Sequence, residues 1–324
     1  MLIVRATFFI EKIRDRKNTG SMKRSFFLQL LPIVALLIAT GCDSGGNSLP
    51  PNPKVQMTLD TDDLTPLVDG FSYKAWARVD GVYWGTNAFN VTETGQFTTA
   101  AGQFTDKSFV MAVDITDADL VVISVEGKTG GGDAPSGTVV MAADVTGTTM
   151  TLSTSHPAAL GADFSSESGQ FTIMTPSDSD PANEAHGVWF VTGSGDNISA
   201  GLTLPALPEG WAYEGWVITA NDGGFSTGKF VANDDQDLSA FYSHPDVPPF
   251  PGEDFLLNAP TGVTFPMDLS GHAVSITAEP FPDDTIVPYG ITVMQGSIPA
   301  GVQGGSVHQL TGSGLGPSAT ITIF

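Results

Sequence analysis

The sequence predicts an all-β protein: two tandem, related β-sandwich modules of the immunoglobulin-like kind, which follow a signal peptide and a flexible tether. The composition favours strands and turns over helices, with 37 Gly and 22 Pro among 324 residues. After residue 41, apolar residues alternate or form short blocks, and no stretch keeps the 3.6-residue period of an amphipathic helix. The third observation is a long stretch that occurs twice.

The duplication is clearest in an aromatic motif. Residues 70–76 (GFSYKAW) recur with the same spacing as residues 210–216 (GWAYEGW). Further landmarks follow at a constant offset of 153 residues: 122–126 (VISVE) with 275–279 (SITAE), and 137–141 (GTVVM) with 290–294 (GITVM). Two copies are too few for a solenoid. We therefore expect two β units, either self-contained or packed together, and name residues 64–145 the first repeat and 202–298 the second repeat.

Strand signals place the elements within these modules. Residues 71–79 alternate in polarity, and Asp80-Gly81 then provides a hairpin turn. The continuous apolar run 120–125 (LVVISV) is typical of a strand buried on both faces. The first module is expected at residues 55–148, and the second at 149–324 with an extra N-terminal hairpin segment.

The N-terminal residues predict export and lipidation. Residues 1–21 are interpreted as an upstream extension before a true start at Met22, so that residues 1–41 comprise this extension and a signal peptide. The apolar run 26–39 has 14 residues, which is short for a membrane span. It leads into residues 38–42 (IATGC), which resemble the bacterial lipobox, so Cys42 is the expected lipidation (palmitate) site. An uncleaved apolar helix is the alternative.

The residues from Cys42 onward also predict a tether and a location in the cell envelope. Residues 42–54 are rich in Gly, Ser and Pro and are expected to be a flexible tether. The expected location is the cell envelope, lipid-anchored to a membrane. The outer membrane or cell surface is favoured, and Asp43 leaves the inner membrane open.

Charge and cysteine content exclude several classes of function. The chain has a formal net charge of −22, and from Cys42 onward it has 6 basic and 33 acidic residues. A surface this acidic repels nucleic acid, so no nucleic-acid partner is expected. One cysteine excludes an internal disulfide and a thiolate zinc cluster. The acidic clusters at 60–63, 178–180 and 234–237 lack the EF-hand pattern; we expect solvated loops and no cofactor, with calcium binding as the alternative.

No catalytic motif is present. The five histidines have no short metal-ligand spacing, and neither H-E-x-x-H nor G-x-S-x-G occurs. We therefore expect a protein that is not an enzyme, although a Ser-His-Asp triad assembled in space remains an alternative. Glu126 and Glu279 follow buried strands and are expected to accept hydrogen bonds from backbone N–H groups.

The aromatic strand is the candidate binding site. On a strand, Lys74, Trp76 and Arg78 share one face, which could form an aromatic platform for a sugar or peptide. The alternative is a tryptophan covered by neighbouring structure. In the second repeat, Trp216 is flanked by Glu214 and Ile218, so a basic platform would belong to the first repeat alone.

Both repeats resemble the extracytoplasmic C-terminal domain of the anti-sigma-K factor family. The matching motifs are Tyr73/Trp76, Tyr213/Trp216, Gly228-Lys229-Phe230 and residues 276–280 (ITAEP), whereas Gly127 stands where the family has proline. The family sequesters a sigma factor through a cytoplasmic domain followed by a transmembrane helix, for which this chain has no room before its signal. The resemblance thus implies an exported, sensor-like domain.

The expected function combines these observations. The protein is predicted to be a lipid-anchored envelope protein whose anti-sigma-factor-like β modules act in binding, sensing or scaffolding, without catalysis. Its expected partners are the membrane, through the lipid, and an envelope protein or a glycan. A carbohydrate- or peptide-binding surface lipoprotein is one alternative, and an envelope hydrolase with a dispersed Ser/His/Asp site is another.

Overall fold

The computed structural model describes residues 56–127, 132–194, 197–220, 223–282, 286–313 and 316–324. These ranges hold 21 β-strands and no α-helix, so the all-β prediction is confirmed. Within them, no helix is long and apolar enough to cross a membrane. The predicted signal peptide, Met22, Cys42 and the tether at 42–54 lie outside the described residues. All the strands belong to one compact unit within residues 50–324.

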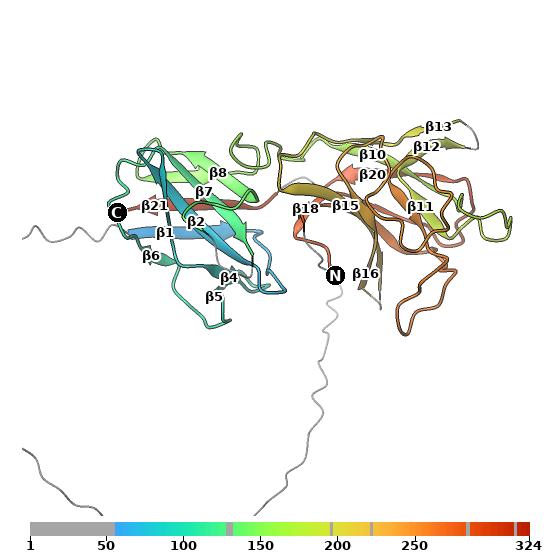
Figure 1. Ribbon diagram of the computed structural model, residues 1–324, viewed down its shortest axis with the longest axis horizontal. Coiled ribbons are helices and arrows are strands. Elements are labelled where there is room, and N and C mark those ends of the chain that lie inside the picture. Colours follow the sequence, from blue (N-terminus) through green and yellow to red (C-terminus); the bar gives the residue numbers. More distant parts are fainter. Residues whose placement is uncertain (1–55, 128–131, 195–196, 221–222, 283–285, 314–315) are drawn as a thin grey trace, which may run out of the picture. The chain divides into compact units, whose positions relative to one another are not determined.

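The strands form antiparallel sheets (Figure 1). A four-stranded sheet has the order β6 (Ser108–Val110), β1 (Gln56–Asp62), β21 (Ser318–Ile323), β9 (Thr149–Leu152). A six-stranded sheet has the order β5 (Phe97–Thr99), β4 (Phe89–Val91), β2 (Ser72–Val79), β7 (Leu120–Glu126), β8 (Val139–Asp144), with β3 (Val82–Gly85) paired to β2.

The largest sheet contains the second repeat. Its order is β16 (Gly223–Phe230), β15 (Trp211–Thr219), β18 (Ala273–Pro280), β19 (Ile291–Ser297), β20 (Val307–Gly312), β10 (Ser168–Ile173), β11 (Gly187–Trp189), β17 (Gly252–Asp254), with β14 (Leu202–Thr203) paired to β10. The strands β12 (Val191–Ser194) and β13 (Asn197–Ala200) form a separate pair.

The sequence duplication is also a structural one. In the first repeat, β2 pairs with β7 so that Trp76 lies opposite Val122. In the second, β15 pairs with β18 so that Trp216 lies opposite Ser275, the residue 153 positions after Val122, so the two tryptophans have equivalent partners. In both repeats a β-bulge follows one residue further along β7 or β18. The two copies therefore share strand order, register and bulge.

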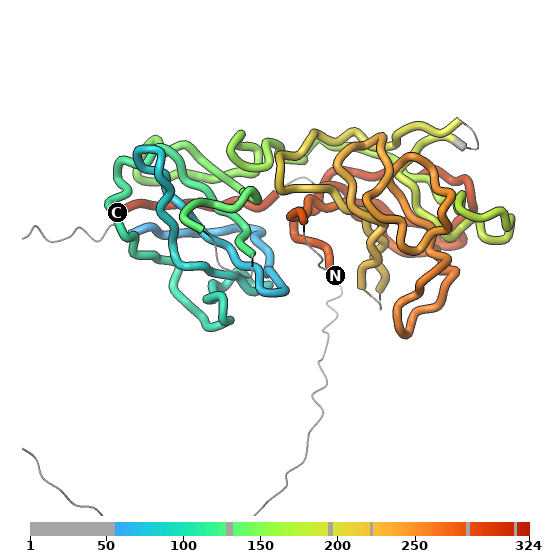
Figure 2. Tube along the Cα trace, viewed as in Figure 1, coloured from blue at the N-terminus to red at the C-terminus, as the bar shows by residue number. Residues whose placement is uncertain are grey.

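The last strand crosses the expected module boundary at 148/149. Both β9 and β21, which the sequence assigns to the second module, pair with each other, and β21 also pairs with β1 of the first module. Figure 2 shows the red C-terminal segment alongside the first blue strand. The buried side chains of β21 are Ala319, Ile321 and Ile323. Their alternation predicts a strand but carries no information about which strand it joins, because partner choice is long-range.

The two repeats pack together rather than standing alone. One cluster of buried apolar side chains takes residues from both repeats and from the three large sheets. The hydroxyls of Tyr73 and Tyr289 lie 3.2 Å apart, and the Thr138 hydroxyl donates to the Gly210 carbonyl at 3.3 Å. The contact between repeats thus involves the start of the aromatic motif in each copy.

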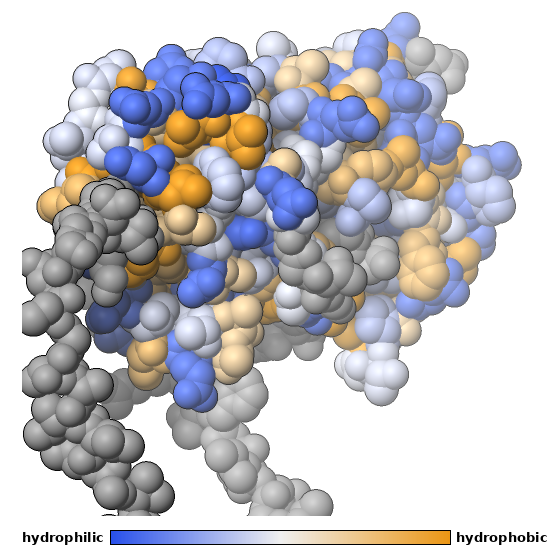
Figure 3. All heavy atoms as spheres, turned by 60° about the vertical axis from the view of Figure 1, so that its left-hand side comes forward, coloured by the Kyte–Doolittle hydropathy of each residue, from blue (hydrophilic) through white to orange (hydrophobic). Residues whose placement is uncertain are grey.

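The surface mixes apolar and hydrophilic side chains, as the face drawn in Figure 3 shows. Several large apolar side chains are exposed in the described part of the chain, among them Ile286 (84%), Phe104 (74%) and Val82 (52%). Singly scattered apolar residues are ordinary on protein surfaces, so the question is which of them border a concave site.

Candidate functional site

A hydrogen-bonded relay fixes the tryptophan of the first repeat. Trp76 Nε1 donates to Ser124 Oγ at 2.9 Å, and that hydroxyl donates to the carboxylate of Glu126. Glu126 Oε1 also accepts the backbone N–H of Ser136 at 3.2 Å. Each buried polar group thereby has a partner, as burial requires.

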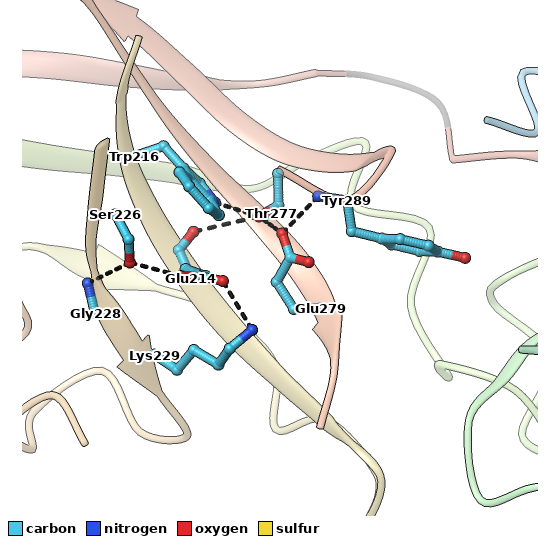
Figure 4. Close-up of polar contacts among 8 residues, drawn as sticks. All are labelled: Glu214, Trp216, Ser226, Gly228, Lys229, Thr277, Glu279 and Tyr289. Atoms are coloured by element: carbon cyan, nitrogen blue, oxygen red, sulfur yellow. Dashed lines mark hydrogen bonds and ion pairs between the residues drawn. The ribbon is translucent and has the colours of Figure 1, made fainter. Parts of the chain in front are cut away.

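The second repeat contains the same relay (Figure 4). Trp216 Nε1 donates to Thr277 Oγ1 at 2.9 Å, and Thr277 donates to Glu279. Glu279 Oε1 accepts the backbone N–H of Tyr289 at 2.8 Å, so the expectation that both glutamates bind backbone N–H groups is confirmed. Burial raises the pKa of Glu279 to about 7. The same hydrogen-bonded relay therefore fixes the buried tryptophan in both repeats.

The structure places the four predicted binding side chains as follows. Trp76 and Trp216 are each 1% exposed. Lys74 lies with Nζ 3.8 Å from the centroid of the Trp76 ring, and Arg78 makes a two-pronged ion pair with Asp119 at 2.8 and 3.0 Å. The predicted cation–π neighbour therefore exists, but it covers the indole instead of flanking an open platform.

Neighbouring side chains cover the Trp76 ring, so this ring forms no exposed platform. Trp76 packs with the buried side chains of Leu120, Val122, Ala142 and Ala159. The segment containing Ala159 has no strand pattern, and nothing local in the sequence indicates that it folds over this face. Both faces of β2 are consequently buried or half-buried.

The ring of Trp216 has different surroundings. It borders a groove with a volume of about 540 Å³, which we name the Trp216 groove. Its apolar lining is Trp216, Phe225, Tyr242, Val263, Ile286 and Val287, and its side-chain hydroxyls come from Ser226, Tyr242 and Thr261. A concave, mostly apolar surface with a few polar groups is the usual form of a ligand site. The sequence indicated Trp216 but not the groove, because the other walls come from four separate segments.

Two strands and packed loops build this groove. Trp216 lies on β15 and Phe225 on its hairpin partner β16. At Gly224 a Cβ atom would lie 3.1 Å from Trp216 Cε3, so glycine allows the backbone to approach the ring closely.

Aromatic packing holds the far wall. Tyr242 meets Phe265 edge-on with ring centroids 5.3 Å apart, and Phe265 packs 6.3 Å from Phe225. The buried ring of Phe255 contacts all three. Such mutually packed rings form a stiff surface, since each is fixed by several neighbours.

A buried ion pair lies beneath Ser226. The hydroxyl of Ser226 donates to Glu214 Oε1 at 2.5 Å, and Lys229 Nζ lies 2.8 Å from Glu214 Oε2 (Figure 4). Gly228 N in turn donates to Ser226 Oγ at 3.0 Å. Ser226 thus connects the groove surface to a carboxylate that is only 4% exposed.

Two further carboxylates lie in this half of the protein. The backbone N–H of Tyr242 donates to Glu253 Oε2 at 3.2 Å, and burial raises the pKa of Glu253 to about 7. Asp237 accepts the N–H of Gly252 at 2.8 Å. Burial, reinforced by the charges of Glu253 and Glu214, raises the pKa of Asp237 well above its usual range.

The two repeats differ in what lies opposite the tryptophan. In the first repeat Gly85 pairs with Trp76, and a Cβ there would come within 2.8 Å of the indole and clash with Lys74. In the second repeat Ser226 pairs with Trp216. The first repeat has Lys74 at the position that Glu214 occupies in the second. Both tryptophan side chains are equally buried, but Lys74 lies over Trp76, whereas a groove lies beside the strand of Trp216.

Across the described ranges, no three His, Cys, Asp or Glu side chains are placed to hold a metal ion. His308 Nε2 lies 2.9 Å from Ser306 Oγ, but this hydroxyl donates to the Gln303 carbonyl at 2.6 Å. The hydroxyl proton is therefore directed away from the imidazole, so His308 does not act as a base toward Ser306 in this arrangement.

Comparison of the whole chain with models of protein families, with curated proteins and with solved structures finds no match. The geometry of the chain itself must therefore carry any assignment of function.

Proposed function

We propose that the chain is an exported cell-envelope protein, anchored by a lipid on Cys42, that binds a partner through its second repeat and catalyses no reaction. The observation that carries the proposal is the Trp216 groove. The duplicated aromatic strand has the same scaffold and an equally buried tryptophan in both copies, but Lys74 lies over Trp76 in one copy, whereas a groove of about 540 Å³ lies beside the strand in the other. Because the scaffold is shared, a function specific to the second repeat is expected where its surroundings differ from those of the first.

The anchoring part of the proposal rests on the sequence. A basic start at Lys23-Arg24, an apolar run over 26–39 and small residues before Cys42 form a lipoprotein signal. Several acyl chains on one residue hold a folded domain stably on a membrane. The tether at 42–54 then gives the β modules reach above that membrane, with the outer membrane or cell surface favoured.

The binding part is tested by site-specific crosslinking in the native envelope. A photoreactive residue at Ile286, which borders the groove and is 84% exposed, should give a discrete adduct. The same residue at Val82, an exposed position on β3 of the first repeat, serves as the matched control. An adduct at neither position, or equal adducts at both, contradicts a partner site at the groove.

Anchoring is tested separately by metabolic labelling. Radiolabelled palmitate should enter the wild-type protein and not Cys42→Ala. Label that persists in the variant would refute attachment at this cysteine and leave the groove proposal unaffected.

A carbohydrate ligand is the second candidate, because aromatic rings with adjacent hydroxyls suit sugar rings. Three hydroxyls, on Ser226, Tyr242 and Thr261, line the Trp216 groove. A panel of envelope glycans distinguishes the two candidates: saturable glycan binding that Ser226→Ala weakens would replace a protein partner with a sugar.

A further inference from the structure

The strand β16 is the outermost strand of the largest sheet, with β15 between it and β18 (Figure 4). In an antiparallel pair, alternate main-chain N–H and C=O groups of each strand point away from the partner. Within the described residues, the main chain of 224–227 makes no hydrogen bond beyond the ladder with β15, and the next outward bond runs from Leu238 N to the Lys229 carbonyl at 2.8 Å. This part of β16 is therefore an open sheet edge, which is a template for a further strand.

The Trp216 groove lies along this open edge. Four consecutive residues of β16, 223–226, line it. Ser226 lies opposite Trp216 and shares its face of the sheet, whereas Phe225 points to the other face and packs with Phe265. Because the groove contacts residues of both faces, it opens at the edge of the strand and not on one face of the sheet.

Apolar walls stand on both sides of this edge. Tyr242, which packs on Phe265, lies on the side of Phe225. At Gly224 a Cβ atom would lie 3.3 Å from Pro288 Cδ, so the segment 286–288 lies on the other side. Among the described residues that line the groove, none has a charged side chain. A slot with a wall on each side has room for one extended chain, and its lining favours apolar side chains.

The stretch that supplies one of these walls is longer in the second repeat than in the first. The offset between the copies is 140 residues at the start of the aromatic motif (70 and 210) and 153 residues at the strands β7 and β18 (122 and 275). The second repeat therefore has 13 additional residues between these landmarks, in the stretch that contains Tyr242 and Val263. One wall of the groove thus comes from the part of the second repeat that differs in length from the first.

We infer that the Trp216 groove binds an extended, apolar segment of a partner polypeptide, which adds as a further strand to the open edge of β16. Main-chain hydrogen bonds to residues 224–227 provide affinity, and the walls on either side receive alternate side chains of the segment. The inference rests on the proposed function, since it names the chemistry of the partner and the way in which the groove binds it.

The test uses the full mature protein and a displayed library of random seven-residue peptides. Sequences that bind should be rich in Val, Ile, Phe and Tyr and poor in Pro and in charged residues. One selected peptide is then synthesised with a single N-methyl group at each position in turn, which keeps the side chain and removes the main-chain donor. Methylation at every second position should weaken binding about ten-fold, whereas methylation at the positions between should change it less than about three-fold.

Hydrogen exchange and two variants locate the added strand. When the peptide binds, exchange should slow at alternate amides of residues 223–227, because the amides between them already bond to β15. The amides of β3 (Val82–Gly85), the corresponding strand of the first repeat, should keep their exchange rates. Thr261→Trp fills the groove and should abolish binding, whereas Thr264→Trp, at an exposed position outside the lining on the same loop, should leave the affinity within about two-fold.

The outcomes separate the inference from the proposed function. A loss of affinity that does not alternate along the peptide would show side-chain binding to a plain apolar groove and overturn strand addition. Equal slowing at β3 would show unspecific pairing with exposed edges and also overturn it. A dimer of the protein that Thr261→Trp dissociates would assign the edge to a second copy in place of a partner. A library without binders, together with an adduct at Ile286 in the envelope, would reject the added strand while keeping the partner site; failure of both would reject both.

Discussion

The indole nitrogen of Trp216 donates a hydrogen bond of 2.9 Å to the hydroxyl of Thr277, and Trp76 does the same to Ser124 at the same distance. Each hydroxyl then donates to a glutamate two residues further along its strand. The aromatic motif that recurs at residues 70–76 and 210–216 is compatible with two binding platforms. The relay gives the motif a structural role, because it holds each tryptophan ring against the neighbouring strand.

Thr277→Val tests the relay in the second repeat. The change keeps the shape of the side chain but leaves Trp216 Nε1 and Glu279 short of a hydrogen-bond partner. We expect the free energy of unfolding to fall by about 1–3 kcal/mol in urea titrations. Thr277→Ser retains the hydroxyl and should recover most of this loss. A Val variant as stable as the wild type would contradict a structural role for the relay.

The free energy of unfolding should fall as pH rises from about 4.5 to about 7, because the pKa of Glu279 differs between the unfolded and the folded protein. Burial raises the pKa of this carboxyl from 4.5 to about 7. Between these values the folded protein keeps the proton that the unfolded chain has lost, so this contribution to stability is present at low pH and is lost as pH rises through about 7.

The measurement is the urea midpoint of wild type and Glu279→Gln at pH 5 and pH 8. The wild type should be more stable at pH 5, with about 3 kcal/mol of the difference assigned to this group. Glu279→Gln should show a smaller dependence on pH, whereas Glu93→Gln at an exposed position should retain the wild-type dependence. If Glu279→Gln leaves the pH dependence of the unfolding free energy unchanged, that dependence does not come from Glu279. Glu253 would then be the next group to test.

Local patterns predicted some of these features and could not predict others. The aromatic spacing and the constant offset of 153 residues indicated the duplication, and the structure pairs the corresponding strands in the same register and places the two bulges at that offset. The partner of β21 was not predictable, because its alternation fits any sheet with one buried face. The burial of Trp76 and the Trp216 groove depend on loops distant in sequence, such as the segments that contribute Ala159 and Val263.

Removal of residues 318–324 tests the pairing of β21 with β1. Without β21, β1 loses its antiparallel partner and the core loses Ile321 and Ile323. We expect the deletion to cost at least about 3 kcal/mol of stability. Hydrogen exchange should increase in β1 and β9 of the deletion variant. Phe324→Ala, at a side chain that is 67% exposed, is the control and should retain protection; unchanged exchange in the deletion would contradict the observed pairing.

Lys74→Met tests the cation–π contact in the first repeat. Methionine keeps an apolar chain over the Trp76 ring but removes the ammonium, so a loss of about 0.5–1 kcal/mol is expected. Lys107, whose Nζ lies 5.7 Å from the Phe97 ring and pairs with Asp60, supplies the matched variant Lys107→Met, for which a smaller loss is expected. Thermal unfolding of the two variants side by side gives the comparison. A larger loss for Lys107→Met would contradict a specific contact at Trp76.

The central claim is that the second copy of a duplicated aromatic strand is the binding copy. Photocrosslinking in the native envelope tests it most directly. A photoreactive residue at Ile286, which lines the Trp216 groove, should give a discrete adduct, and the same residue at Val82 of the first repeat should give none. An adduct at Val82 with none at Ile286 would contradict the claim.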